Sequence, residues 1–464
     1  GQQHADALQN LHEGNQQNYR HPHDIRLVPI IAIADRDIAK AAAAVLTADE
    51  CVGVTLADSM INVANTALNT FDKVKTVAVR DTLKGFAEAD PNFSGSLLDN
   101  IISAVGTGNA TFTATDAPDS NGAVTADVTA LLNFSDATST EAAIRFENAV
   151  NTINLTAGKQ ITAEDPLDLG KLFSTTATIN LTASDKADTL TIASKAGTID
   201  LAGGDDEITL AKGADVDTIN LGAGTNKLVL TAATSGAAAG DVKISKIIGG
   251  SGVDTIDLSA TSTVATGATI TINGKGGADV ITASAAKDVI VLGDGASLGL
   301  GVQSGKASGT SDANAMSDAT LLKGFTKDDD KIAFVKGSVL EKFGATDAFK
   351  DDFNASATSG AVVTGKINYS STADNLLKAA TVEELKGTLV DGTASAGKAT
   401  IAANAEAIVV TKVGSDAKVL NIWYVKNDAT AVVDDNDTIV LLGTLASSSA
   451  LTLDASNFTT IESA

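Results

Sequence analysis

The sequence is poor in cysteine and in aromatic residues. It contains one cysteine, Cys51, among 464 residues, which excludes an internal disulfide framework. Phe, Trp and Tyr make up only 4% of the residues, so Val, Ile, Leu and Ala must fill the interior. Small aliphatic side chains of this kind suit a thin solenoid, in which each turn packs on its neighbours, better than a deep globular core.

Positive charge and long apolar runs are also scarce. The chain has 33 basic and 57 acidic residues, a net charge of −24, which makes nucleic acid and anionic membranes poor partners. The run Val28–Ala34 is far too short to span a bilayer, so we expect no membrane insertion. The acidic excess serves either solubility or the binding of divalent cations, and the clustering of aspartates inside short repeats favours the second.

The usual catalytic motifs are missing. His12-Glu13 has no histidine at position 16, so H-E-x-x-H is absent. Gly295–Gly299 matches the nucleophile elbow G-x-S-x-G, but no histidine follows it, whereas that fold places its catalytic histidine last. All four histidines precede residue 24, where a disordered or interface-forming arm is favoured over a transition-metal site. We therefore expect no enzyme activity.

A short phrase repeats through the middle of the chain. Gly249–Asp257 reads Gly-Gly-Ser-Gly-Val-Asp-Thr-Ile-Asp and fits the nonapeptide G-G-x-G-x-D-x-U-x, with U a large apolar residue, at every defined position. Gly274–Thr282 and Leu201–Thr209 are near copies. The first large apolar residues of successive phrases fall at 190, 199, 208, 219 and 228, with gaps of 9, 9, 11 and 9 residues. This period predicts a solenoid of short strands, each with one inward face.

The residue types in the phrase suit a hard cation. Glycine in the turn allows a positive φ and lets backbone carbonyls approach an ion, and the aspartate that follows supplies a carboxylate oxygen. Stacked turns would align these oxygens in rows, which are the ligands that Ca²⁺ prefers. We therefore predict that the following residues bind Ca²⁺ through carboxylate or backbone carbonyl oxygens: Asp188, Gly203, Gly204, Asp206, Asp217, Gly249, Gly250, Gly252, Asp254, Gly274, Gly276, Gly277, Asp279 and Asp288.

A metal-free structure is the alternative. The same pattern would arise in a right-handed β-helix that merely places Asp and Gly at its corners. This alternative is favoured for Ala283–Val291, which has no glycine and carries Lys287 where the motif expects a small loop residue.

The repeats resemble those of the RTX family, calcium-binding bacterial proteins exported by type I secretion. The resemblance covers roughly residues 183–291, and Thr320–Phe334 looks like the segment that commonly follows such repeats. It implies a parallel β-roll that folds on binding Ca²⁺ outside the cell. The final segment, Leu451–Ala464, is small, hydroxylated and free of basic residues, and resembles a type I secretion signal.

Three regions are expected along the chain: a mixed α/β region at 1–150, the β-solenoid at 151–335 and a β-rich C-terminal module at 336–464. In the first, we predict helices at Asp35–Glu50, Ser59–Lys73 and from the capping box Thr138–Glu141 to about Val150, and strands at Val52–Leu56 and Val74–Val79. The strands and helix of residues 52–79 also loosely resemble a repeat of large secreted bacterial surface proteins.

In the C-terminal module, a second capping box, Thr381–Glu384, predicts a helix with Leu385 and Leu389 on one face. Strands are expected at Ala407–Val413, Val419–Val425 and Asp437–Leu442, with Trp423 and Tyr424 in the core or an interface.

These features together predict a structural surface protein. The chain resembles the S-layer proteins of Gram-negative bacteria that share RTX repeats, which implies a secreted protein that assembles with copies of itself into a calcium-dependent lattice. Residues 1–150 would then anchor the lattice to cell-surface polysaccharide. The alternatives are a calcium-dependent adhesin or biofilm-matrix protein, and a secreted enzyme with an RTX tail.

Overall fold

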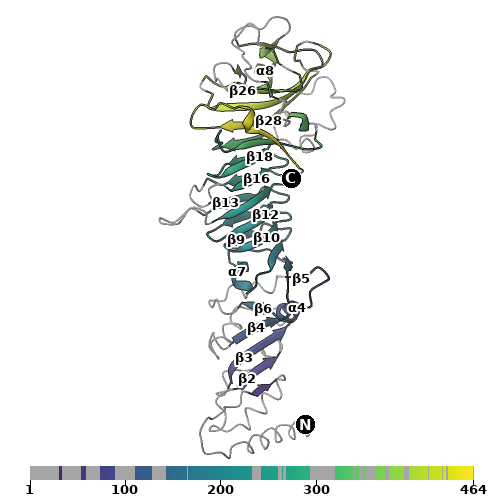
Figure 1. Ribbon diagram of the computed structural model, residues 1–464, viewed down its shortest axis with the longest axis vertical. Helices are drawn as coiled ribbons and strands as arrows, with labels where there is room; N and C mark the ends of the chain where they lie inside the picture. Colours follow the sequence, from purple (N-terminus) through teal and green to yellow (C-terminus); the bar gives the residue numbers. More distant parts are fainter. Residues whose placement is uncertain are drawn as a thin grey trace, which may run out of the picture. The chain divides into compact units, whose positions relative to one another are not determined.

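The protein is mainly β-structure with long parallel sheets, as shown by the computed structural model (Figure 1). The structure describes residues 31–33 and 54–58 and most of 74–462; it does not describe 89–109, 128–142, 232–241, 260–263, 265–267, 293–318, 344–348, 351–360, 371–375, 391–396 and a few single positions. The chain divides into two compact units, Gly1–Thr182 and Ala183–Ala464. No helix among the described residues is long and apolar enough to cross a membrane.

Among the described residues, unit 1 contains two sets of parallel strands and two short helices. One set is a five-stranded sheet in the order β1-β2-β3-β4-β6, and the other pairs β5 with β7 and β7 with β8. The bounds are β1 Ile31–Ile33, β2 Val54–Asp58, β3 Val74–Asp81, α4 Leu83–Glu88, β4 Ala110–Ala114, β5 Ala123–Asp127, β6 Ile144–Phe146, β7 Thr152–Thr156, α7 Leu169–Leu172 and β8 Thr178–Thr182.

The predictions for unit 1 have mixed outcomes. The two expected strands exist as β2 and β3, and they pair in parallel. The predicted helices Asp35–Glu50 and Ser59–Lys73 lie outside the described residues. The helix predicted to run to Val150 is wrong, because β6 occupies Ile144–Phe146 and pairs with β4. The capping box there is a purely local signal, and burial of Ile144 in a parallel sheet overrides it.

In unit 2, successive strands alternate between two parallel sheets. The odd-numbered strands from β9 to β19 pair in sequence in one sheet, and the even-numbered strands from β10 to β20 pair in sequence in the other. The bounds in the first sheet are β9 Thr189–Ile192, β11 Glu207–Leu210, β13 Lys227–Leu230, β15 Thr255–Asp257, β17 Val280–Thr282 and β19 Thr320–Lys323. Those in the second are β10 Lys195–Asp200, β12 Asp215–Asn220, β14 Lys243–Ile248, β16 Thr269–Asn273, β18 Lys287–Val291 and β20 Lys331–Val335.

The apolar repeat explains this arrangement. The strands of the first sheet, from β9 to β19, bury alternate side chains, and the register joins equivalent apolar residues of neighbouring strands, such as Leu190, Ile208 and Leu228. Fully burying one such side chain stabilises the fold by about 1.5–3 kcal/mol. Each phrase of about nine residues therefore supplies one strand. Successive phrases alternate between the two sheets, so two phrases make one full turn of the chain.

A C-terminal antiparallel group continues the first sheet. β28 pairs in parallel with β19 and antiparallel with β27, which pairs antiparallel with β26, so the three predicted strands are confirmed. The helix predicted after Thr381 is also confirmed, and Leu385 and Leu389 are buried in the core around Trp423. The remaining bounds are η6 Glu341–Phe343, β21 Phe349–Lys350, β22 Ile367–Asn368, β23 Leu377–Lys378, α8 Val382–Thr388, β24 Leu389–Val390, β25 Ala399–Thr400, β26 Glu406–Val413, β27 Val419–Lys426, β28 Thr438–Ala446, η8 Ala455–Asn457 and β29 Phe458–Ile461.

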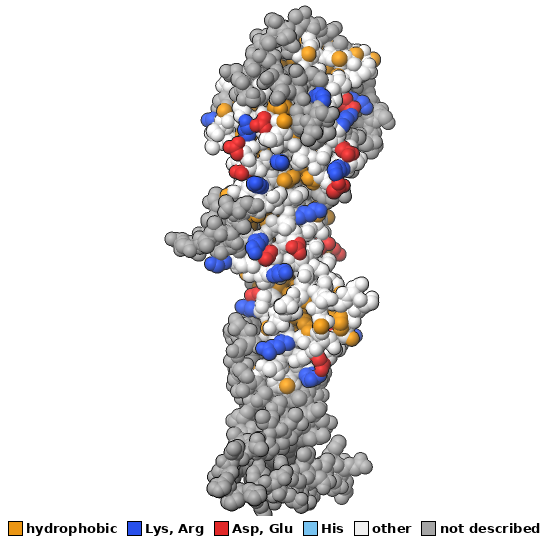
Figure 2. Space-filling view, in the orientation of Figure 1, with side chains coloured by type: hydrophobic (Ala, Val, Ile, Leu, Met, Phe, Trp, Pro, Cys, Tyr) orange, Lys and Arg blue, Asp and Glu red, His pale blue; other side chains and the backbone are white. Residues whose placement is uncertain are grey.

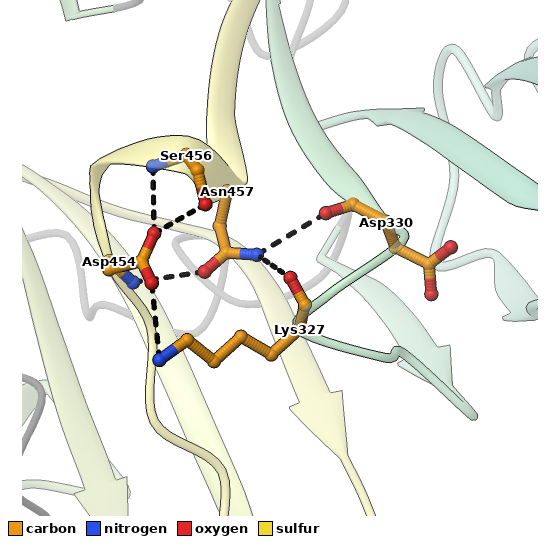
Figure 3. Close-up of polar contacts among 5 residues, drawn as sticks. All are labelled: Lys327, Asp330, Asp454, Ser456 and Asn457. Carbon is orange, nitrogen blue, oxygen red and sulfur yellow. Dashed lines mark hydrogen bonds and ion pairs between the residues drawn. The ribbon is translucent and has the colours of Figure 1, made fainter.

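The segment that resembles a secretion signal forms part of this fold. β29 pairs in parallel with β20 at the end of the second sheet. Just before it, the buried Asn457 donates from Nδ2 to the carbonyl oxygens of Lys327 and Asp330 at 2.6 and 3.3 Å, while Lys327 pairs with Asp454 at 3.1 Å (Figure 3). The last described residues are thus tied to the loop that precedes β20.

Candidate metal centres

A row of buried polar side chains lies where the chain enters the first sheet of unit 2. Each precedes a strand, from β9 to β17, by one residue, and the sheet register therefore stacks them on one another. They are at most 2% exposed. The members of this row, called the corner row below, are Asp188, Asp206, Asn226, Asp254 and Asp279.

Hydrogen bonds connect the corner row from one turn to the next. Oδ1 of Asp206 accepts the backbone N–H of Asp188 at 2.7 Å, and Oδ1 of Asn226 accepts that of Asp206 at 3.0 Å. Asp254 and Asp279 repeat the contact, accepting from Asn226 at 3.1 Å and from Asp254 at 2.9 Å. One oxygen of each acceptor side chain is therefore used to hold the neighbouring turn.

Glycine-rich turns stack directly before the corner row. A Cβ built on Gly224, Gly252 or Gly277 would lie 1.8–1.9 Å from the carbonyl oxygen of the glycine in the preceding turn. A Cβ on Gly204 would likewise lie 2.5 Å from the carbonyl oxygen of Lys186. Only glycine allows backbones to approach this closely, and the result is a column of carbonyl oxygens beside the carboxylates.

The predicted glycines belong to these turns. Aligned by register, the turns are Leu201–Asp206, Leu221–Asn226, Gly249–Asp254 and Gly274–Asp279, and they contain Gly203, Gly204, Gly249, Gly250, Gly252, Gly274, Gly276 and Gly277. In two turns the carboxylate lies over the first glycine: Oδ2 of Asp254 and of Asp279 would be 2.6 and 2.1 Å from a Cβ built on Gly249 and Gly274.

Two predicted aspartates lie elsewhere. Asp217 is exposed on β12, in the second sheet, and is not part of the corner row. Asp288 is fully buried on β18, also in the second sheet, where its backbone N–H donates to Oδ1 of Asp330 at 3.0 Å. Asp288 and Asp330 therefore form a separate carboxylate pair.

Burial makes the ionised form costly for three of the predicted aspartates, Asp206, Asp254 and Asp288. It raises the pKa of Asp206 to about 6, with a further contribution from the charges of Asp188 and Asp205. Burial also raises the pKa of Asp254, and it raises that of Asp288 to about 7, where the charge of Asp330 adds to the effect. A bound cation would favour the ionised form and remove this cost.

Lysines neutralise surface carboxylates but not the centre of the corner row. Lys227 on β13 pairs with Glu207 on β11 at 2.7 Å, and Lys243 pairs with Asp215 across the second sheet at 3.5 Å. On the face of the molecule drawn in Figure 2, basic and acidic side chains are interspersed. Among the described residues, neither Asp206 nor Asp254 has a basic ion-pair partner.

A third acidic group lies in the connection between β27 and β28. Carboxylate oxygens of Asp428, Asp434 and Asp437 lie within 4.8 Å of one another, close enough to hold one metal ion. Asp437 is buried and accepts the backbone N–H groups of the other two, both at 2.6 Å. Its pKa is raised by burial and then by the two neighbouring charges.

The sequence prediction missed several members of these groups. Asn226 stands at the start of one of the repeated phrases, but its side chain is an amide, whereas the pattern predicts carboxylate ligands. Asp330 lies in Thr320–Phe334, whose three consecutive aspartates give no indication of which one faces inward. Asp428, Asp434 and Asp437 have no regular spacing, and only the fold of their loop brings them together.

Comparisons with known proteins add no assignment: no family model, no curated protein and no solved structure matches the chain.

Proposed function

We propose that this protein is a calcium-binding structural protein of the bacterial cell surface, an S-layer protein whose β-roll is stabilised by Ca²⁺ between its stacked turns. The corner row carries this proposal, because it places buried carboxylates on successive turns beside stacked glycine carbonyls. A donor set made only of oxygen atoms matches the preference of Ca²⁺.

The residues present fit such an ion. Oδ2 of Asp206 is buried and has no hydrogen-bond partner. An unsatisfied carboxylate oxygen in a buried site costs free energy, about 1–3 kcal/mol or more for a charged group. A cation beside it would remove that cost, and the neighbouring turns offer backbone carbonyl oxygens as further ligands. The trio Asp428, Asp434 and Asp437 provides a second oxygen-only group in the same unit.

Calcium binding would couple folding to export. Extracellular calcium sites have dissociation constants of about 10⁻⁴–10⁻³ M. A tenfold excess of Ca²⁺ over such a constant stabilises the folded state by about 1.4 kcal/mol per site. In the cytosol, where Ca²⁺ is scarce, repulsion among the stacked aspartates would lower the stability of the folded state and so favour the unfolded chain that type I secretion requires.

The proposal includes the partners and the location of the protein. The chain is secreted, assembles with copies of itself at the cell surface, and attaches to surface polysaccharide through residues 1–150. The resemblance to RTX-bearing S-layer proteins and the acidic composition support these steps.

Negative-stain electron microscopy of the purified full chain tests the proposal. We expect ordered sheets in millimolar Ca²⁺ that dissolve in EGTA. The double variant Asp254→Asn/Asp279→Asn should lose the sheets, whereas the exposed Asp217→Asn should keep them. Discrete particles under both conditions would contradict a lattice protein and favour the adhesin alternative.

A further inference from the structure

The buried aspartates of unit 2 differ in what contacts their second oxygen, Oδ2. In three turns, a serine or threonine stands four residues before the aspartate; these are called the hydroxyl turns. They are Ser184–Asp188, Ser284–Asp288 and Thr326–Asp330. The turns that end at Asp206, Asp254 and Asp279 have no hydroxyl at that position and are called the glycine turns.

The hydroxyl turns share one set of contacts. Oδ2 of Asp188 accepts the backbone N–H of Ser184 at 2.8 Å and its hydroxyl at 2.9 Å. The corresponding distances from Ser284 to Asp288 are 2.7 and 3.1 Å. Thr326 repeats both contacts to Asp330, at 2.6 and 3.0 Å. Because Asp188 leads into the first sheet and the other two lie in or before strands of the second, the arrangement does not depend on the sheet.

The serine hydroxyls are fixed from both sides. While each donates to the carboxylate, its oxygen accepts the N–H two residues further on, from Lys186 at 3.3 Å and from Ala286 at 2.9 Å. The hydroxyl hydrogen therefore occupies a lone pair of Oδ2, and turning it away would leave a buried carboxylate oxygen with one donor fewer.

The glycine turns lack this donor. Ala202 stands four residues before Asp206, and its N–H donates instead to Asp200 at 3.0 Å, so that Oδ2 of Asp206 is buried without a partner. In the next such turn, Oδ2 of Asp254 accepts the N–H of Gly250 at 3.0 Å, and glycine has no hydroxyl to add.

We infer that the hydroxyls of Ser184, Ser284 and Thr326 replace a cation, so that divalent ions bind at the glycine turns and not at the hydroxyl turns. This inference rests on the proposed calcium binding and specifies which corners take part in it. Along the sequence of unit 2, the hydroxyl turns come first and last, and the glycine turns lie between them. The ends of the stack are then satisfied without metal, and its centre depends on metal.

Counting the Ca²⁺ ions bound by the full chain tests the inference, with equilibrium dialysis in CaCl₂ as the measurement. Ala202→Ser places a hydroxyl four residues before Asp206, and we expect one ion fewer than in the wild type. Ser184→Gly removes a hydroxyl, and we expect one ion more. Ala187→Ser, at an exposed position of a turn, is the control and should leave the count unchanged.

The outcomes separate the inference from the proposed function. A wild type that binds Ca²⁺, with the same count in both variants, would overturn the inference and leave the proposed function intact. A wild type that binds no Ca²⁺ would refute the proposed function itself. If Ala202→Ser loses the wild-type circular dichroism spectrum, Ser184→Gly decides alone: an additional ion supports the inference and an unchanged count overturns it.

Discussion

At the scale of single residues, burial raises the folded-state pKa of two acids of the corner row, Asp206 and Asp254, above the usual value of an aspartate. For Asp206 the shift is from 3.8 to about 6, mainly because of burial. The folded state therefore binds this proton more tightly than the unfolded state. The stabilisation that results is fully present below about pH 4 and is lost as the pH rises through about 6.

Asp206→Asn should remove this pH dependence. An amide already occupies the same position one turn later, at Asn226, where it accepts from the backbone and donates to Asp254 at 3.0 Å. In EGTA, we expect the variant to melt at a higher temperature than the wild type at about pH 8, and the difference to shrink towards about pH 5. Thermal unfolding followed by circular dichroism measures both.

Asp217→Asn is the matched control, because it removes the same charge from an exposed position on β12. It should leave the pH dependence of the melting temperature as in the wild type. Equal pH profiles for Asp206→Asn and the wild type would show that the Asp206 carboxylate does not titrate in the way its burial implies.

At the scale of elements, the glycine turns set how closely neighbouring turns can approach. Gly252→Ala would place a Cβ 1.8 Å from the carbonyl oxygen of Gly224, and a backbone carbonyl cannot move aside without disturbing the strands on either side. We expect a loss of about 3 kcal/mol in the free energy of unfolding, at the upper end of the usual cost of overpacking. Urea denaturation in Ca²⁺ measures this loss.

Gly387→Ala provides the comparison within the same chain. Gly387 lies in helix α8, and a Cβ there would meet no atom within 4 Å. Alanine is a better helix former than glycine, so this variant should be more stable than the wild type by about 0.5–1 kcal/mol. Similar losses in both variants would indicate that the close approach at Gly252 is unimportant.

The sequence predicts the elements of unit 2 better than their arrangement. Alternating apolar residues such as Leu190 and Ile192 suffice to locate the strands, because the period of two is a local signal. Their assignment to two sheets is not local. Phrases that look equivalent in sequence enter different sheets, which is why Asp217 lies on the surface while Asn226, in the next phrase, lies in the corner row.

At the scale of the whole molecule, the net charge of −24 destabilises the fold by repulsion, whereas the calcium sites would stabilise it, and the two effects respond differently to added ions. Repulsion among surface carboxylates is long-range and is screened by any salt, with a Debye length of about 10 Å at 0.1 M ionic strength. Binding at the glycine turns depends on ligand number and geometry, which differ between Ca²⁺ and Mg²⁺, since Mg²⁺ requires near-octahedral coordination and retains its water.

Unfolding in EGTA, Mg²⁺ and Ca²⁺, each at about 0.3 M NaCl, should separate these two contributions. Since the salt already screens surface repulsion, Mg²⁺ should add little. If the free Ca²⁺ concentration is about ten times the dissociation constant, three glycine-turn sites together should add about 4 kcal/mol to the free energy of unfolding. The single tryptophan, Trp423, is fully buried, so its fluorescence reports the transition in unit 2. Equal stabilisation by the two ions would mean that screening, and not a built site, accounts for the effect of calcium.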